Sequence, residues 1–111
     1  MQSELRPRLA TGEARSLSPT QRLIFRVHAL ERMFERRITV EDVRSVVGNG
    51  EVIQSYPEDK PYPSRLVLGW RGTRPIHAVV AEDGEAGILI VVTAYEPDPI
   101  QWDAGFKRKV L

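Results

Sequence analysis

Two histidines and a row of arginines are the residues of this chain best suited to chemistry. His28, Arg32 and Arg36 follow one another at intervals of four, which places all three on one face of a helix. An imidazole gains or loses a proton near neutral pH, whereas a guanidinium stays charged and can hold a phosphate. Together they suit cleavage of a phosphodiester bond. The alternative is an ordinary solvated helix face, on which Arg32 pairs with a neighbouring glutamate.

The second histidine, His77, lies in an alternating run that predicts a β-strand over Pro75–Glu82. Strand alternation places its side chain on the face shared with Val79 and Ala81. The functional interpretation brings the two imidazoles into one site as a proton-transfer pair. The alternative is a buried histidine whose ring nitrogens are hydrogen-bonded inside the core.

The last predicted strand, Ile88–Tyr95, is apolar on both faces except at its end. Thr93 and Tyr95 point the same way there, and polar groups gathered at one end of a buried strand are what a cleft needs. Equally, Thr93 could satisfy a neighbouring backbone group while Tyr95 extends its hydroxyl to water. The predicted substrate-binding set comprises these two residues and the bases Arg36, Arg65, Lys107 and Arg108.

Several other kinds of site are excluded or have no support. The chain contains no cysteine, which excludes disulfides, a thiolate nucleophile and Cys-ligated zinc. We expect no metal site, because the two histidines are far apart in sequence and their neighbours at helical spacing are arginines rather than ligands. Glycine-rich phosphate loops and the GxSxG motif are absent, so we expect neither a nucleotide cofactor nor a serine hydrolase.

The formal net charge of +1 conceals an uneven distribution along the chain. Residues 1–37 carry eight arginines against four acids, residues 38–105 carry five bases against eleven acids, and residues 106–111 carry three bases. Thirteen of the sixteen bases are arginine, whose planar fork matches phosphate. The basic ends hint at a polyanionic partner such as RNA, although an arginine-rich genome would produce the same bias.

The elements that must position these residues fit in a single domain. A chain of 111 residues, 41% hydrophobic and 28% charged, has the composition of one small globular domain. Residues 1–17 show no apolar period and predict a flexible tail before a domain over residues 18–111. No apolar run is long enough for a membrane span and no secretory signal begins the chain, so we expect a cytoplasmic protein with no membrane partner.

The domain is expected to start with a helix. Ser18, Pro19 and Gln21 match a capped helix start, and an apolar stripe continues it over about residues 19–36. The alternative is a short strand over Leu23–Arg26 that leads into a shorter helix.

A second helix and four strands are expected next, giving an α+β fold with two helices packed on a four-stranded, mainly antiparallel sheet. Thr39 and Asp42 form a capping box that predicts a helix over about residues 40–48. Short hairpin loops favour antiparallel pairing. Asp98 begins a short C-terminal helical turn that carries Trp102. The strands are predicted at Glu51–Tyr56, Arg65–Arg71, Pro75–Glu82 and Ile88–Tyr95.

Two spaced motifs give the chain a resemblance to a known family. His-Ala-x-x-Arg-Met at residues 28–33 and Thr-Ala-Tyr-x-Pro-Asp at residues 93–98 occur together, and over about residues 28–108 the chain resembles the bacterial domain-of-unknown-function 4258 family. That family is placed by remote similarity near the RelE and barnase-like toxins, which are small metal-independent ribonucleases. Arg37 stands where such sequences commonly have glycine. Further residues that carry the resemblance are Arg36, Ile38, Val43, Tyr56, Pro57, Tyr62, Pro63, His77 and Trp102.

The resemblance implies an endoribonuclease toxin of a toxin–antitoxin pair, with His28, Arg32, His77 and the Thr93–Tyr95 strand end lining a cleft. We expect it to cleave single-stranded RNA by attack of the ribose 2′-hydroxyl. One histidine acts as the base, the other protonates the leaving 5′-oxygen, and Arg32 with Arg36 stabilises the charged phosphorane. Its implied partner is an antitoxin with a zinc-binding module and a helix-turn-helix. The alternative is a non-catalytic RNA- or protein-binding module of the same fold, and a small-ligand pocket is a third possibility. The nuclease hypothesis requires both imidazoles in one open groove near Arg32.

Overall fold

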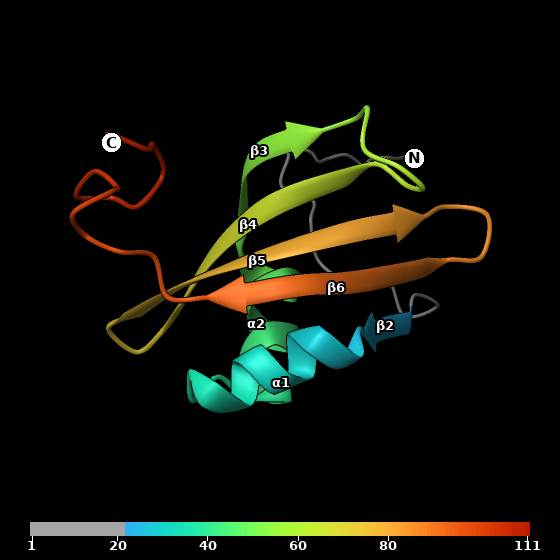
Figure 1. Cartoon of the computed structure of the whole chain (residues 1–111), viewed down its shortest axis with the longest axis horizontal. Coiled ribbons are helices and arrows are strands. Elements are labelled where there is room, and N and C mark those ends of the chain that lie inside the picture. Colours follow the sequence, from blue (N-terminus) through green and yellow to red (C-terminus); the bar gives the residue numbers. More distant parts are fainter. Residues whose placement is uncertain (1–21) are drawn as a thin grey trace, which may run out of the picture.

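The computed structural model describes residues 22–111, in which both helices lie together against one face of a five-stranded sheet (Figure 1). The predicted tail over residues 1–17 and the helix start at Ser18 lie outside these residues. No helix of the described part is long and apolar enough to cross a membrane. The elements in chain order are β2 (Arg22–Phe25), α1 (Val27–Glu35), α2 (Val40–Asn49), β3 (Glu51–Tyr56), β4 (Ser64–Arg71), β5 (Arg74–Asp83) and β6 (Ile88–Tyr95).

The first predicted helix is instead a strand followed by a shorter helix. β2 pairs in parallel with the start of β6, from Arg22 opposite Ile88 to Phe25 opposite Val91. The prediction of one helix over residues 19–36 is therefore wrong, and its alternative, a short strand before a shorter helix, is confirmed. The physical reason is that Leu23 and Phe25 alternate onto the core, while β6 supplies the backbone partners that a helix would have supplied internally.

The sheet has the strand order β2-β6-β5-β4-β3. The three pairs formed by β3 to β6 are antiparallel, as the short connections before β5 and β6 predicted. The prediction of four strands is corrected to five strands in a mixed sheet, because β2 adds a parallel strand at the outer edge of β6.

The second helix begins where its capping box was predicted. The Thr39 hydroxyl accepts a hydrogen bond from the Asp42 amide and the Asp42 carboxylate accepts one from the Thr39 amide, each at 2.9 Å. Before it, Arg37 closes the turn from α1 at a φ of 58°. This is the left-handed backbone that glycine would adopt more easily, so the turn keeps its shape even though arginine occupies the position.

The main core fills the space between the helices and the sheet. Ala29 and Met33 of α1 enter it from one side, and Ile76 and Ala78 of β5 meet them from the other. The opposite face of the sheet is contacted by the C-terminal segment, which we define as residues 96–111. This segment starts with the predicted short turn, in which the amides of Gln101 and Trp102 both donate to the Asp98 carbonyl.

Candidate nucleic-acid interface

The two histidines lie on opposite sides of the sheet. His77 is flanked by Ile76 and Ala78, which point into the core shared with α1, so its own side chain points to the other face. His28 lies on the outer surface of α1, where its side chain is 91% exposed. The expectation that both imidazoles share one open groove is therefore wrong. The physical reason is that α1 and the His77 ring occupy different faces of the same sheet.

The row of side chains predicted from the four-residue spacing, His28, Arg32 and Arg36, is present on α1 and forms the α1 ridge. It has the features of an ordinary solvent-exposed helix face. His28 Nδ1 lies 3.4 Å from a carboxylate oxygen of Glu31, and an Arg32 guanidinium nitrogen lies 3.4 Å from Glu35. Arg36, at the end of the helix, donates to the carbonyl oxygen of Ala94 at 2.9 Å. His28 and Arg32 remain open to a ligand from solvent, whereas Arg36 also ties α1 to the end of β6.

His77 is a buried histidine with partners on both ring nitrogens. Its Nε2 lies 2.8 Å from the carbonyl oxygen of Phe106, and its Nδ1 lies 3.4 Å from the Tyr95 hydroxyl. A carbonyl only accepts, so Nε2 carries the proton and Nδ1 accepts from the phenol. Trp102 packs edge-on against the ring with centroids 4.5 Å apart. Burial lowers the pKa of His77, and the bond to Phe106 opposes this effect in part, so the ring is neutral at neutral pH.

Thr93 and Tyr95 lie on the same face of the sheet, as the strand alternation predicted, but Arg65 lies elsewhere. Tyr95 is in register with His77, and Thr93 is in register with Val79 on the same face. Burial raises the pKa of Tyr95, so its phenol stays protonated. Arg65 lies at the opposite end of the sheet, where it donates to Glu82 at 2.8 Å. The structure therefore does not bring Arg65 together with the other predicted binding residues.

Basic residues lie at the end of the sheet where β4 and β6 finish. Figure 1 shows this end at the left, beside the turn between β4 and β5. Arg74 donates to the carbonyl oxygen of Arg37 at 3.0 Å and lies 3.4 Å from that of Arg36. Arg71 bonds Asp42 at 2.9 Å. Within residues 22–111, Arg36, Arg37 and Lys109 have no ion pair. We define the basic end as Arg36, Arg37, Arg71, Arg74, Lys107, Arg108 and Lys109.

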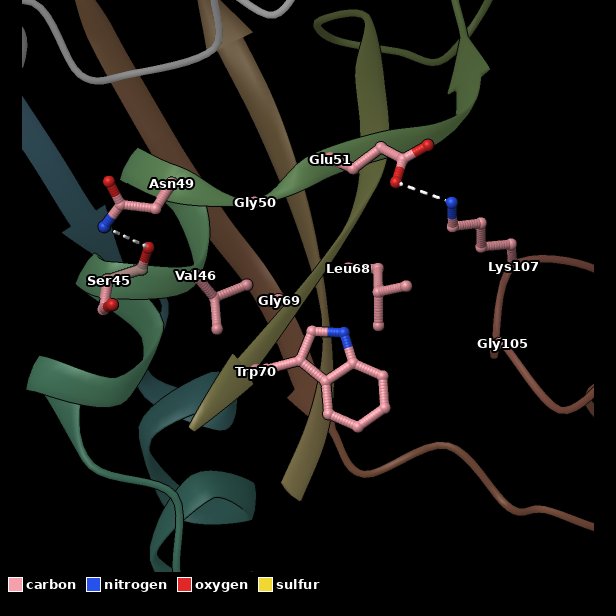
Figure 2. Close-up of a pocket in the computed structure, with 10 residues that line it drawn as sticks. All are labelled: Ser45, Val46, Asn49, Gly50, Glu51, Leu68, Gly69, Trp70, Gly105 and Lys107. Atoms are coloured by element: carbon pink, nitrogen blue, oxygen red, sulfur yellow. Dashed lines mark hydrogen bonds and ion pairs between the residues drawn. The ribbon is translucent and has the colours of Figure 1, made fainter. Parts of the chain in front are cut away.

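A cavity of about 590 Å³ opens beside the basic end, between α2, β4 and the C-terminal segment. Figure 2 shows the side chains of Val46, Leu68 and Trp70 along it, with Glu51 and Lys107 joined across its rim; that ion pair measures 3.0 Å. Lys107 was predicted from the sequence as a binding residue, whereas the cavity was not predicted. Its signal was Trp70, a large aromatic side chain at the end of a strand.

The carboxylates and histidines of residues 22–111 do not form a cluster of three or more that could hold a metal ion. The site that remains is the group of cations at the basic end, with aromatic side chains beside it. Three of these cations, Arg71, Arg74 and Lys107, pair with Asp42, Glu96 and Glu51. Cations with aromatic side chains beside them are typical of a binding site for an anionic, ring-containing ligand.

The described chain is thus an α+β domain with one basic end. A model of the family described as "Domain of unknown function (DUF4258)" matches residues 25–96, and the chain belongs to this family. The match covers both sheet-packed helices and β3 to β6, and it stops before the turn that carries Trp102. No curated protein and no solved structure matches the chain.

Proposed function

We propose that this protein binds single-stranded RNA at its basic end. The observation that carries the proposal is the position of Arg36 and Arg37 where α1 meets the end of the sheet. The guanidinium of Arg74 lies beside them, bonds to their two backbone carbonyl oxygens and pairs with Glu96. Arginine forks onto phosphate oxygens, and cations grouped in this way neutralise successive phosphates of a nucleic acid.

Two features favour RNA in its single-stranded form. Trp70 is 49% exposed beside the basic end, and an aromatic ring next to cations can stack on an unpaired base. The opposite end of the sheet carries Asp83 at the end of β5 and Glu85 in the turn that follows. These acids would repel a phosphate backbone, so the RNA is oriented toward one end of the molecule.

The proposal is tested by titrating a fluorescent, unstructured RNA with the protein at several salt concentrations. We expect log affinity to fall linearly with log salt, with a slope of about 0.7 for each phosphate contacted. The double variant Arg37→Ala/Lys109→Ala removes two cations that have no ion pair with any residue of the described part of the chain and lowers both affinity and slope. Arg22→Ala, at the far end of β6, is the matched control. No salt-dependent binding by the parent protein would refute the proposal.

The α1 ridge favours a second candidate function, a metal-independent endoribonuclease on a RelE/barnase-like fold. In this form His28 acts without His77, because the two histidines lie on different faces of the sheet and the two-histidine mechanism is ruled out. His28 is exposed and stands one helical turn from Arg32, so an RNA strand could reach both. His28 would take the proton of the ribose 2′-hydroxyl as that oxygen attacks the adjacent phosphorus. The bond to the 5′-oxygen breaks, and that oxygen takes a proton from water. Arg32 would stabilise the charged phosphorane.

Cleavage is tested with end-labelled RNA in a chelating buffer. We expect products with 2′,3′-cyclic phosphate ends, and His28→Ala lowers the rate by about 10²- to 10⁴-fold. Arg22→Ala, which alters an exposed arginine away from the ridge, leaves it unchanged. Intact RNA in the presence of the parent protein would end this second candidate and leave the binding proposal standing.

A nuclease of this kind acts with a cognate antitoxin, for which we propose a protein carrying a zinc-binding module and a helix-turn-helix. Expression of the parent chain alone is expected to slow bacterial growth, and co-expression of its cognate antitoxin is expected to restore it. Normal growth of cells that express the chain alone would count against this partner.

A further inference from the structure

We propose that the cavity beside Trp70 holds one base of the bound RNA, a purine with an amino group, stacked on the indole ring. This inference rests on the proposed RNA-binding function and names the part of the ligand that the protein distinguishes. The cavity volume of about 590 Å³ lies within the range of small-ligand sites, so a nucleotide base fits within it.

The register of the sheet leaves this cavity open. β3 begins at Glu51, directly opposite Leu68, so among the described strands Gly69 to Arg71 pair only with β5. The backbone groups of these residues on the side away from β5 therefore lack a strand partner. Backbone groups at such an edge can hydrogen-bond to the heteroatoms of a ligand.

Trp70 supplies the stacking surface. Trp70 lies on the same face of β4 as Leu66 and Leu68. These two leucines are buried, whereas Trp70 is 49% exposed. Phe106 packs against the indole edge-on, with ring centroids 5.9 Å apart and planes 71° apart. This contact fixes the position of the ring and leaves part of its surface exposed. A half-exposed indole held in one position is suited to stacking on a base.

Polar groups on the rim favour a base that donates hydrogen bonds. Asn49 donates its side-chain amide to the carbonyl oxygen of Ser45 at 3.2 Å, which leaves its own side-chain oxygen to accept. The Glu51 carboxylate also accepts, and it pairs with Lys107 at 3.0 Å (Figure 2). Acceptors on this rim suit the amino group of adenine or guanine. Lys107 provides the positive charge for the phosphate attached to that base.

The test compares oligoadenylate with oligouridylate of equal length in the same binding assay. The parent protein is expected to prefer oligoadenylate, and Trp70→Ala is expected to lower its affinity for oligoadenylate by about 10- to 100-fold, the range of base stacking on an aromatic side chain. Trp70→Phe retains a ring and is expected to keep most of the affinity. Thermal melting tests whether each variant is folded. We expect both variants to fold because Trp70 is only partly buried.

Two outcomes overturn the inference in distinguishable ways. If the parent binds both RNAs in a salt-dependent manner and folded Trp70→Ala binds oligoadenylate as the parent does, the stacking site is wrong and the basic end remains. If the parent binds neither RNA, the proposed function itself fails. Quenching of indole fluorescence by adenosine 5′-monophosphate in the parent, and its loss in Trp70→Phe, is the expected direct signature of the stacked base.

Discussion

The Nε2 nitrogen of His77 lies 2.8 Å from the carbonyl oxygen of Phe106, a residue 29 positions further along the chain. This bond ties the C-terminal segment to the middle of β5. Phe106 holds a φ of 61°, a backbone conformation that non-glycine residues adopt only when their surroundings compensate for it. The contacts of its carbonyl with His77 and of its ring with Trp70 are two such compensations. His77 therefore anchors the wall of the cavity that contains Trp70.

Replacing His77 with alanine is expected to destabilise the fold. The substitution opens a cavity in a fully buried position and leaves the Phe106 carbonyl without this donor. We expect the free energy of unfolding to fall by about 2–4 kcal/mol, measured by urea denaturation. His28→Ala is the control, because an exposed side chain of this kind changes stability by less than about 0.5 kcal/mol. Equal stability of the two variants would contradict the anchoring role of His77.

The free energy of unfolding is expected to decrease as the pH is lowered from about 7.5 to about 5.5. Burial holds the pKa of folded His77 below its ordinary value of 6.5, so the unfolded chain takes up the proton first. The stabilisation from neutral His77 is complete above about pH 6.5 and is lost progressively below it. Urea titrations across this range should show a smaller pH dependence for His77→Gln. A parental pH dependence in that variant would contradict the assignment.

Two carboxyl groups with lowered pKa values affect the stability of the protein in a separate, more acidic pH range. Backbone hydrogen bonding at Thr39 lowers the pKa of Asp42, and backbone hydrogen bonding at Lys107 lowers that of Asp103. A carboxyl with a lowered folded pKa stabilises the protein above its ordinary value of 3.8 and loses that contribution as the pH falls further. These groups therefore do not interfere with the His77 measurement above pH 5.

Two glycines near the end of α2 are expected to respond to alanine in opposite directions. A methyl group at Gly48 would meet no atom within 4 Å, whereas one at Gly69 would lie 2.9 Å from Val46 Cγ2. Gly48→Ala should raise the free energy of unfolding by up to about 1 kcal/mol, because alanine favours a helix. Gly69→Ala should lower it by about 1–3 kcal/mol through overpacking. Thermal melting checks both, and a tolerated Gly69→Ala would show that α2 can move away from β4.

Adjacent residues on α1 provide a test of how the helix packs. Met33 is 2% exposed and Phe34 is 86% exposed. Met33→Ala should cost about 2–5 kcal/mol of unfolding free energy because it leaves a cavity in the core. Phe34→Ala should change it by less than about 0.5 kcal/mol. Chemical denaturation of both variants compares them directly, and a large effect at Phe34 would mean that its side chain is covered in solution.

Local sequence signals predicted α2 and the antiparallel strands well. The capping box at Thr39 needs only residues three positions apart, and the short loops before β5 and β6 leave little choice of pairing. β2 was harder because Leu23 and Phe25 fit both a strand and an apolar helix stripe. The outcome depended on the outer edge of β6, which is more than sixty residues away in the sequence.

Only separate features of the candidate site could be predicted from the sequence, not their arrangement in space. Alternation gave the face of His77, and the four-residue spacing gave the ridge of His28 and Arg32. Neither pattern states which face of the sheet the helices cover, so the distance between the histidines could not be predicted. The cavity beside Trp70 also depends on long-range register, because it requires β3 to start opposite Leu68.

The parallel pairing of β2 with β6 also bears on where a shortened form of the protein can begin. A truncated chain that starts after Phe25 would leave the backbone of β6 from Ile88 to Val91 without its outer neighbour. An exposed strand edge of this kind templates aggregation. Shortened forms of the protein for crystallisation or binding assays should therefore retain Arg22–Phe25, even though these four residues contribute no side chain to the basic end.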